Sequence, residues 1–144
     1  MIRIIGVGSP FGADRLGWAA IDHLQTRAVD GCELIKLDRP GPGLLHYLDG
    51  AQQVVIIDAV AQGLPAGESM LISPQALADP AEQTSCHGFG VAEALALAQS
   101  LGSLPAHVDL IGIGAGQDLA ELPALNVSQL ESLLRQLNIR FKHH

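Results

Sequence analysis

The sequence has few aromatic residues, only two cysteines and no long apolar run. Phe, Trp and Tyr make up 3% of 144 residues while the hydrophobic fraction is 48%, so a core must be built from Leu, Ile, Val and Ala. Cys32 and Cys86 are too few for a disulfide framework and form no CxxC pair. No stretch approaches the roughly 18 apolar residues of a membrane span, and the opening residues do not resemble a signal peptide. We therefore expect no membrane span, a cytoplasmic location and reduced cysteines.

Basic residues are also scarce. Eight Lys and Arg residues stand against 15 Asp and Glu residues, which gives a formal net charge of −7. The basic residues form no cluster, and a nucleic-acid partner would require one. The sequence therefore argues against a nucleic-acid partner, whereas its acidic side chains could attract metal cations.

Apolar runs and amphipathic segments alternate along the chain, whose length suits one domain over residues 1–144. Alternation of this kind predicts an α/β fold with a mostly parallel sheet and helices on both faces. The fourth strand follows the third through a short turn, which makes it a candidate for antiparallel pairing. The predicted strands are 2–8, 32–37, 53–57, 68–72 and 107–114, and the predicted helices begin near 14, 44, 91 and 127.

Four polar residues fall where the predicted strands end or where a helix begins. Asp14 lies in the loop after the first strand, Asp38 closes the second strand, and Asp58 closes the third. His87 lies in the run SCHGFG, just before the helix predicted over 91–101. Ligands of open α/β sheets bind beyond the carboxyl ends of the strands, so these side chains could meet at one edge. Carboxylates with an imidazole suit a divalent metal such as nickel or zinc.

Each of these residues also has a purely structural interpretation. Asp14 could cap the helix that follows it, and Asp38 could fix the Pro/Gly turn after it. Asp58 follows the apolar run QVVII, where an acid would lose its hydration unless it were paired or bound to a metal. His87 has Ser, Cys and Gly neighbours rather than apolar ones, which favours a ligand role.

The tripeptide Gly6-Val7-Gly8 is similar to the start of a phosphate-binding loop, but the rest of that pattern is missing. Phe11 stands where the dinucleotide-binding pattern needs its third glycine, and no GxxxxGK followed by Ser or Thr occurs. The sequence therefore gives little support for a nucleotide site. No nucleophile elbow or catalytic triad is evident either. A small-molecule hydrolase built on the predicted α/β sheet is therefore the least favoured activity.

Five segments of the sequence form an ordered set of motifs. They are GVGSPFGADRLGW (6–18), LDRPGPGLLHYL (37–48), VVIIDAV (54–60), SCHGFGVAEALALA (85–98) and VDLIGIG (108–114). In order and spacing, over nearly the whole chain, this set resembles the hydrogenase maturation endopeptidases, although no single motif is decisive. The resemblance implies a phosphorylase/hydrolase-like fold: a three-layer α/β/α sandwich around a mostly parallel, twisted sheet of about five strands.

The resemblance also implies an activity and a partner. Members of the family remove a C-terminal peptide from the large-subunit precursor of nickel-iron hydrogenase once nickel has been inserted. Asp58 and His87 would be ligands of that nickel, which arrives with the substrate, so the resting protein need not contain a metal. Asp38 would be a functional acid near the scissile bond, and Asp38 or Asp14 could orient a water or act as general base. The activity would be that of a peptidase, aspartic-type or metal-dependent, in a monomer or weak oligomer.

Arg15 departs from the family pattern. The family has two adjacent acids where this chain has Asp14 and Arg15, and the second of those acids is a metal ligand. A guanidinium stays protonated and does not bind metals. Three hypotheses follow: Asp14 supplies the missing oxygen, the substrate supplies more of the nickel's ligands, or the metal function is lost. In the third case Arg15 would pair with Asp58 or Asp38, or bind a peptide carboxylate. The alternative to a peptidase is then a non-catalytic relative that binds a hydrogenase precursor or a maturation factor without cleavage.

Overall fold

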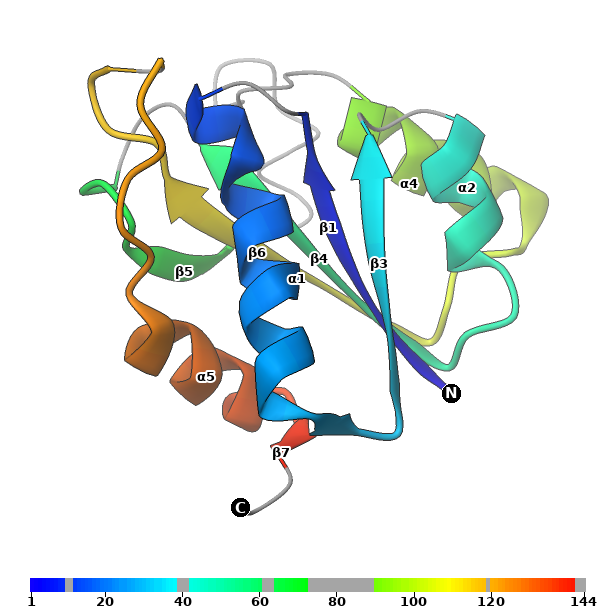
Figure 1. Ribbon diagram of the computed structural model, residues 1–144. Helices are drawn as coiled ribbons and strands as arrows, with labels where there is room; N and C mark the ends of the chain where they lie inside the picture. The colour runs from blue at the N-terminus through cyan, green and yellow to red at the C-terminus, as the bar shows by residue number, and fades with distance from the viewer. Residues whose placement is uncertain (10–11, 39–41, 61–63, 73–89, 119, 142–144) are drawn as a thin grey trace.

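The computed structural model describes residues 1–9, 12–38, 42–60, 64–72, 90–118 and 120–141. Within these ranges strands and helices alternate along the chain (Figure 1). The elements are β1 (Ile2–Gly8), a 3-10 helix η1 (Gly12–Arg15), α1 (Leu16–Arg27), β2 (Val29–Asp30), β3 (Cys32–Asp38), α2 (Pro42–Leu48), β4 (Gln53–Val60), β5 (Ser69–Ile72), α4 (Gly90–Leu101), β6 (His107–Gly114), α5 (Val127–Gln136) and β7 (Arg140–Phe141).

A five-stranded sheet in the order β3-β1-β4-β6-β5 forms the centre of the fold. β1 pairs in parallel with β3 and β4, and β4 pairs in parallel with β6. β5 runs antiparallel to β6, as the short connection between the third and fourth predicted strands suggested. The carboxyl ends of the four parallel strands therefore lie at one edge of the sheet, which is the upper edge in Figure 1.

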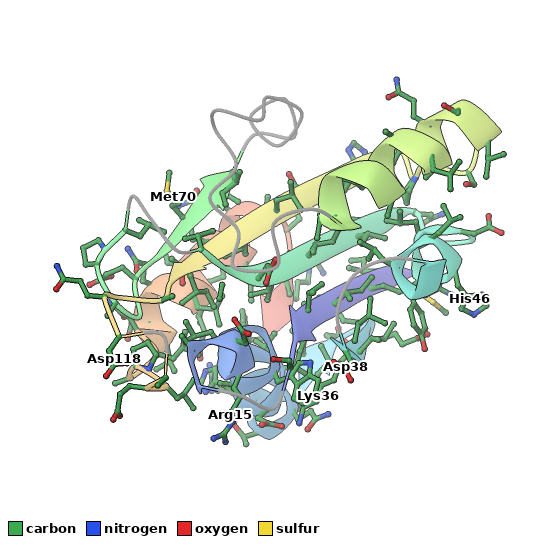
Figure 2. The ribbon with its side chains drawn as sticks, turned by 90° about the horizontal axis from the view of Figure 1, so that it is seen from above. Arg15, Lys36, Asp38, His46, Met70 and Asp118 are labelled. Carbon is green, nitrogen blue, oxygen red and sulfur yellow. The ribbon has the colours of Figure 1, made fainter. Side chains whose placement is uncertain are left out.

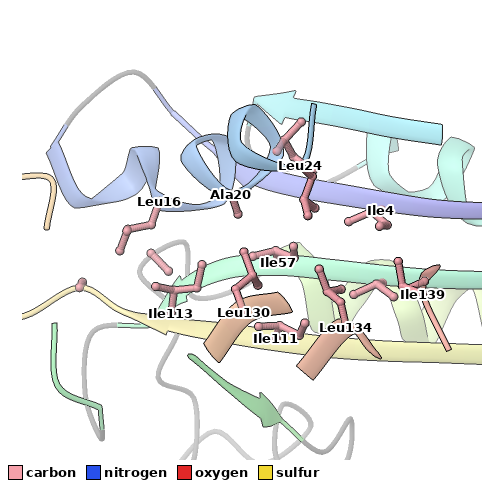
Figure 3. Close-up of a cluster of buried hydrophobic side chains, with 14 of the residues drawn as sticks. Ile4, Leu16, Ala20, Leu24, Ile57, Ile111, Ile113, Leu130, Leu134 and Ile139 are labelled. Atoms are coloured by element: carbon pink, nitrogen blue, oxygen red, sulfur yellow. The ribbon is translucent and has the colours of Figure 1, made fainter. Parts of the chain in front are cut away.

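Helices cover both faces of this sheet. α1 and α5 lie on one face, where Leu16, Leu24, Leu130 and Leu134 pack against side chains of β1, β4 and β6 (Figure 3). α2 and α4 cover the opposite face through a second apolar cluster. That cluster contains Ile5, Val7, Ile35, Leu44, Leu48, Val54, Ile56, Val91, Ala94, Ala98 and Leu110. The three-layer α/β/α arrangement expected from the sequence is thus confirmed.

Gly6 and Gly17 let α1 approach β1 more closely than any other residue would allow. A Cβ atom on Gly6 would lie 2.3 Å from the carbonyl oxygen of Gly17, and one on Gly17 would lie 2.2 Å from that of Val7. Both contacts are with backbone oxygens, so a side chain at either position would force the helix away from the strand. Gly6 of the first strand therefore serves helix packing, which accounts for this glycine without a phosphate ligand.

The structure differs from the expected elements in two places. The third predicted strand does not end at Asp58, because β4 continues through the apolar residues Ala59 and Val60. β2 and β7 form a two-residue antiparallel pair that was not predicted, since two residues are too short to show periodicity. In the part of the chain that the structure describes, no helix is long and apolar enough to cross a membrane.

Candidate functional site

Asp58 lies within β4, near the carboxyl end of the central strand. Its neighbours Ile57 and Ala59 belong to the apolar cluster under α1 and α5. Because side chains alternate along a strand, Asp58 faces the side covered by α2 and α4, together with Ile56. The residue is only 8% exposed, and its Oδ1 accepts a hydrogen bond from the backbone N–H of Ala59 at 2.8 Å. A buried carboxylate in a central strand needs such partners, since it has lost most of its hydration.

Asp38 is the last residue of β3, as the sequence predicted, and its side chain is exposed. It lies opposite Gly8, the last residue of β1. Lys36, two residues earlier, faces α1, where its Nζ lies 2.5 Å from Oδ1 of Asp22. Asp38 shares that face by alternation, and Figure 2 shows Lys36, Asp38 and Arg15 on the same side of the edge. Asp38 and Asp58 therefore leave the sheet on opposite faces.

Asp14 belongs to η1, the single 3-10 turn that joins the loop after β1 to α1. The sequence suggested that Asp14 caps the helix, which is wrong: the N-cap of α1 is Arg15, and no side chain caps this helix end. Asp14 instead closes the turn after β1. Its carbonyl oxygen accepts the N–H of Ser9 at 3.2 Å, and its Oδ2 accepts the Ser9 hydroxyl at 3.3 Å. The half-buried carboxylate is thereby held beside the end of β1.

Arg15 is exposed at the start of α1. One hypothesis from the sequence paired it with Asp58 or Asp38. The ion pairs given for the described residues include none between Arg15 and either acid, and the pairing stays a prediction. Asp14, rather than Arg15, lies against the end of β1.

His87 lies outside the described residues, so its predicted role as a metal ligand stays a prediction. The helix that follows it is described: α4 begins at Gly90, and its Val91 and Ala94 pack in the same apolar cluster as Ile56. α4 thus lies on the face of the sheet to which Asp58 points. Within the described ranges alone, no group of three or more His, Cys, Asp or Glu side chains could hold a metal ion.

Trp18 is a feature of this edge that the sequence analysis missed. The indole Nε1–H donates to the carbonyl oxygen of Leu37 at 3.1 Å, directly before Asp38. Trp18 is the single tryptophan of the chain. That rarity was the only available signal, because neither spacing nor alternation connects position 18 with position 38.

The fold is that of the hydrogenase maturation endopeptidases. The hydrogenase maturating endopeptidase HybD from Escherichia coli superposes with a TM-score of 0.72 at 21% identity, over 97% of this chain and 95% of that one. The hydrogenase maturation protease HybD from Thermococcus kodakarensis superposes with a TM-score of 0.70 at 20% identity, over 94% and 97% of the two chains. At these identities the likeness establishes the architecture.

The sequence comparisons supply the family. Residues 21–122 match the HycI family, described as hydrogenase maturation protease, and the chain belongs to that family. The matched range contains Asp38, Asp58 and His87, whereas Asp14 and Arg15 precede it.

Two curated relatives are hydrogenase expression/formation proteins. HoxM from Cupriavidus necator is 33% identical over 117 residues, which cover 78% of this chain and 58% of HoxM. HupD from Thiocapsa roseopersicina is 34% identical over 119 residues, which cover 78% of this chain and 53% of HupD. The matched part of this chain thus spans only a little over half the length of either relative.

Proposed function

We propose that this chain is a metal-dependent peptidase that removes the C-terminal peptide from a nickel-loaded large-subunit precursor of nickel-iron hydrogenase. The observation that carries the proposal is the match to the maturation protease family over residues 21–122, in a chain with the corresponding fold. The nickel belongs to the substrate, and its recognition would prevent cleavage of precursors that are still empty.

Asp58 and His87 are the proposed ligands for that nickel. Asp58 is buried near the carboxyl end of the central strand and faces the side covered by α4. In the sequence His87 stands three residues before Gly90, where α4 begins, and α4 covers the face to which Asp58 points. A carboxylate and an imidazole are ligands that nickel accepts, and the hydrogen bond from Ala59 would keep the Asp58 carboxylate oriented.

Asp38, which projects from the other face, is the proposed group that handles water. A metal ion polarises a carbonyl and makes it easier for water to attack. Asp38 and Asp14 flank the end of β1, one through its register with Gly8 and the other through its hydrogen bonds with Ser9. We assign Asp38 the role of general base or water-orienting group, with Asp14 as its neighbour at the edge. The scissile peptide would then cross the end of β1, with nickel on the Asp58 side and water on the Asp38 side.

Asp14 is also the proposed source of the oxygen that Arg15 cannot give. It is half-buried and held beside the end of β1, whereas Arg15 is exposed. Of the three hypotheses raised by Arg15, supply by Asp14 therefore fits the described geometry best.

The test is a cleavage assay with purified precursor in nickel-loaded and nickel-free forms, analysed by mass spectrometry. The proposal predicts that the C-terminal peptide appears only with the nickel-loaded precursor. Binding of the loaded precursor without any cleavage would contradict the proposal and support the non-catalytic relative. Equal cleavage of both forms would contradict the role of nickel in recognition.

A further inference from the structure

Trp18 contacts both strands that end beside Asp38. Its Nε1–H donates to the carbonyl oxygen of Leu37, the residue before Asp38. Its ring lies against Gly8, because a Cβ atom on Gly8 would be 2.9 Å from Cδ1 and 3.0 Å from Nε1 of the indole. Gly8 is in turn the register partner of Asp38. One ring on α1 therefore rests on the backbone of β1 and is hydrogen-bonded to that of β3.

The end of β3 needs such support because the sheet supplies little of it. β3 is an edge strand in the described sheet, so β1 is its single neighbour there. β1 itself ends at Gly8, and the N–H of the next residue, Ser9, donates to the carbonyl oxygen of Asp14 rather than to a strand. The ion pair between Lys36 and Asp22 also joins β3 to α1, but both side chains are more than a third exposed. Exposed pairs of this kind restrain the backbone weakly.

We propose that Trp18 is a positioning residue for Asp38. The inference rests on the proposed function, in which Asp38 orients or deprotonates water. A catalytic group whose backbone is held in place loses less freedom when the reaction occurs. The indole fixes the peptide unit from which Asp38 projects.

The test combines Trp18→Phe with Asp38→Glu in a double-mutant cycle. Trp18→Phe keeps an aromatic ring against Gly8 but removes the N–H donor. Asp38→Glu keeps a carboxylate but displaces it by one methylene group, so a measurable rate is expected to remain. We expect Trp18→Phe to lower kcat on nickel-loaded precursor about tenfold with KM changed less than about twofold, as for loss of orientation alone. In the Asp38→Glu background, Trp18→Phe should lower kcat by less than about a third of that tenfold factor. The reason is that the native position of the carboxylate, which Trp18 maintains, is already lost in this background.

Thr26→Val is the matched control. Thr26 lies at the other end of α1, and its hydroxyl also donates to a backbone carbonyl, that of His23, at 2.6 Å. This variant should leave kcat and KM unchanged, and melting curves of all variants report any loss of folding.

The results separate the inference from the proposed function. Wild-type rates in the Trp18→Phe variant, or the same fold loss in both Asp38 backgrounds, would overturn the positioning role while leaving the peptidase assignment in place. No cleavage by the wild-type protein would overturn the proposed function, and the positioning role with it.

Discussion

Asp38 and Asp58 lie towards the same edge of the sheet but project from opposite faces of it. Asp38 shares the α1 face with Lys36, while Asp58 shares the α2 and α4 face with Ile56. β1 lies between their strands. The division matches the two tasks assigned to these acids in the proposed reaction, which are recognition of nickel by Asp58 and orientation of water by Asp38.

Asp14 and Arg15 are adjacent, yet their substitution should have different effects. Asp14→Asn should lower kcat/KM on nickel-loaded precursor by at least about tenfold, because it removes a charged oxygen beside the end of β1. Arg15→Ala should stay within about twofold of the wild-type value, since the side chain is exposed and has no ion pair with a described residue. Steady-state kinetics measure both. A large loss in Arg15→Ala alone would instead indicate that Arg15 binds the peptide.

Gly6→Ala should destabilise the fold. The new methyl group would lie 2.3 Å from the carbonyl oxygen of Gly17, a backbone atom, so α1 must shift from the sheet. Overpacking of this kind costs about 1–3 kcal/mol or more. Gly43→Ala is the control, because its Cβ would meet only Cδ1 of Leu37, at 3.1 Å. That change should alter stability by no more than about 1 kcal/mol. Urea unfolding of the two variants distinguishes them, and equal midpoints would refute the packing role of Gly6.

Glu131 joins α5 to α1 at the end of the molecule remote from the candidate site. Its carboxylate lies 2.6 Å from Nε2 of His23, 3.0 Å from Nε of Arg27 and 3.3 Å from Nη2 of Arg135. Burial opposes ionisation, but the hydrogen bonds from His23 and Arg27 outweigh it and hold the pKa of Glu131 below its ordinary value of 4.5. Because the folded pKa is lowered, the stabilisation is present above that ordinary value and is lost as the pH falls through the folded pKa.

Glu131→Gln should therefore reduce the free energy of unfolding by about 1–3 kcal/mol at neutral pH, as for loss of hydrogen bonds to a charged group. The difference from wild type should narrow as the pH falls below the ordinary value of 4.5 and through the lowered folded pKa. Glu33→Gln is the control: Glu33 is 43% exposed and lies 3.7 Å from Arg3, so its loss should cost less than about 0.5 kcal/mol. If the free energy of unfolding of Glu131→Gln stayed below that of wild type by the same amount down to the lowest pH, the account would be contradicted.

The sequence predicted the layers of the fold because its apolar runs are long and clearly alternate with helices. The position of Asp38 at the end of β3 was also predictable, since a Pro- and Gly-rich stretch begins two residues after it. The end of β4 was not, because Ala59 and Val60 are as apolar as the residues before Asp58. The face of Asp58 could not be predicted either, since a central strand that is buried on both sides shows no alternation.

The remaining details of the edge depend on contacts between residues far apart in sequence. The hydrogen bond from Trp18 to Leu37 joins two elements whose packing is set by Gly6 and Gly17. The 3-10 turn that holds Asp14 takes its hydrogen bonds from Ser9 rather than from the helix start. The sequence suggested a cap for Asp14 only because Asp is frequent at helix N-caps.

The most direct test of the account is single-turnover cleavage of nickel-loaded precursor by wild-type protein and by Asp58→Asn. The amide is nearly the same size and can still accept the hydrogen bond from Ala59, so the variant should fold. Asp30→Asn, at the short β2 strand far from the edge, is the matched control. The account predicts at least about a 100-fold slower reaction for Asp58→Asn, since a carboxylate ligand for the polarising metal is lost, and a wild-type rate for Asp30→Asn. Cleavage by Asp58→Asn within about twofold of wild type would contradict the central claim that this buried acid recognises the nickel of the substrate.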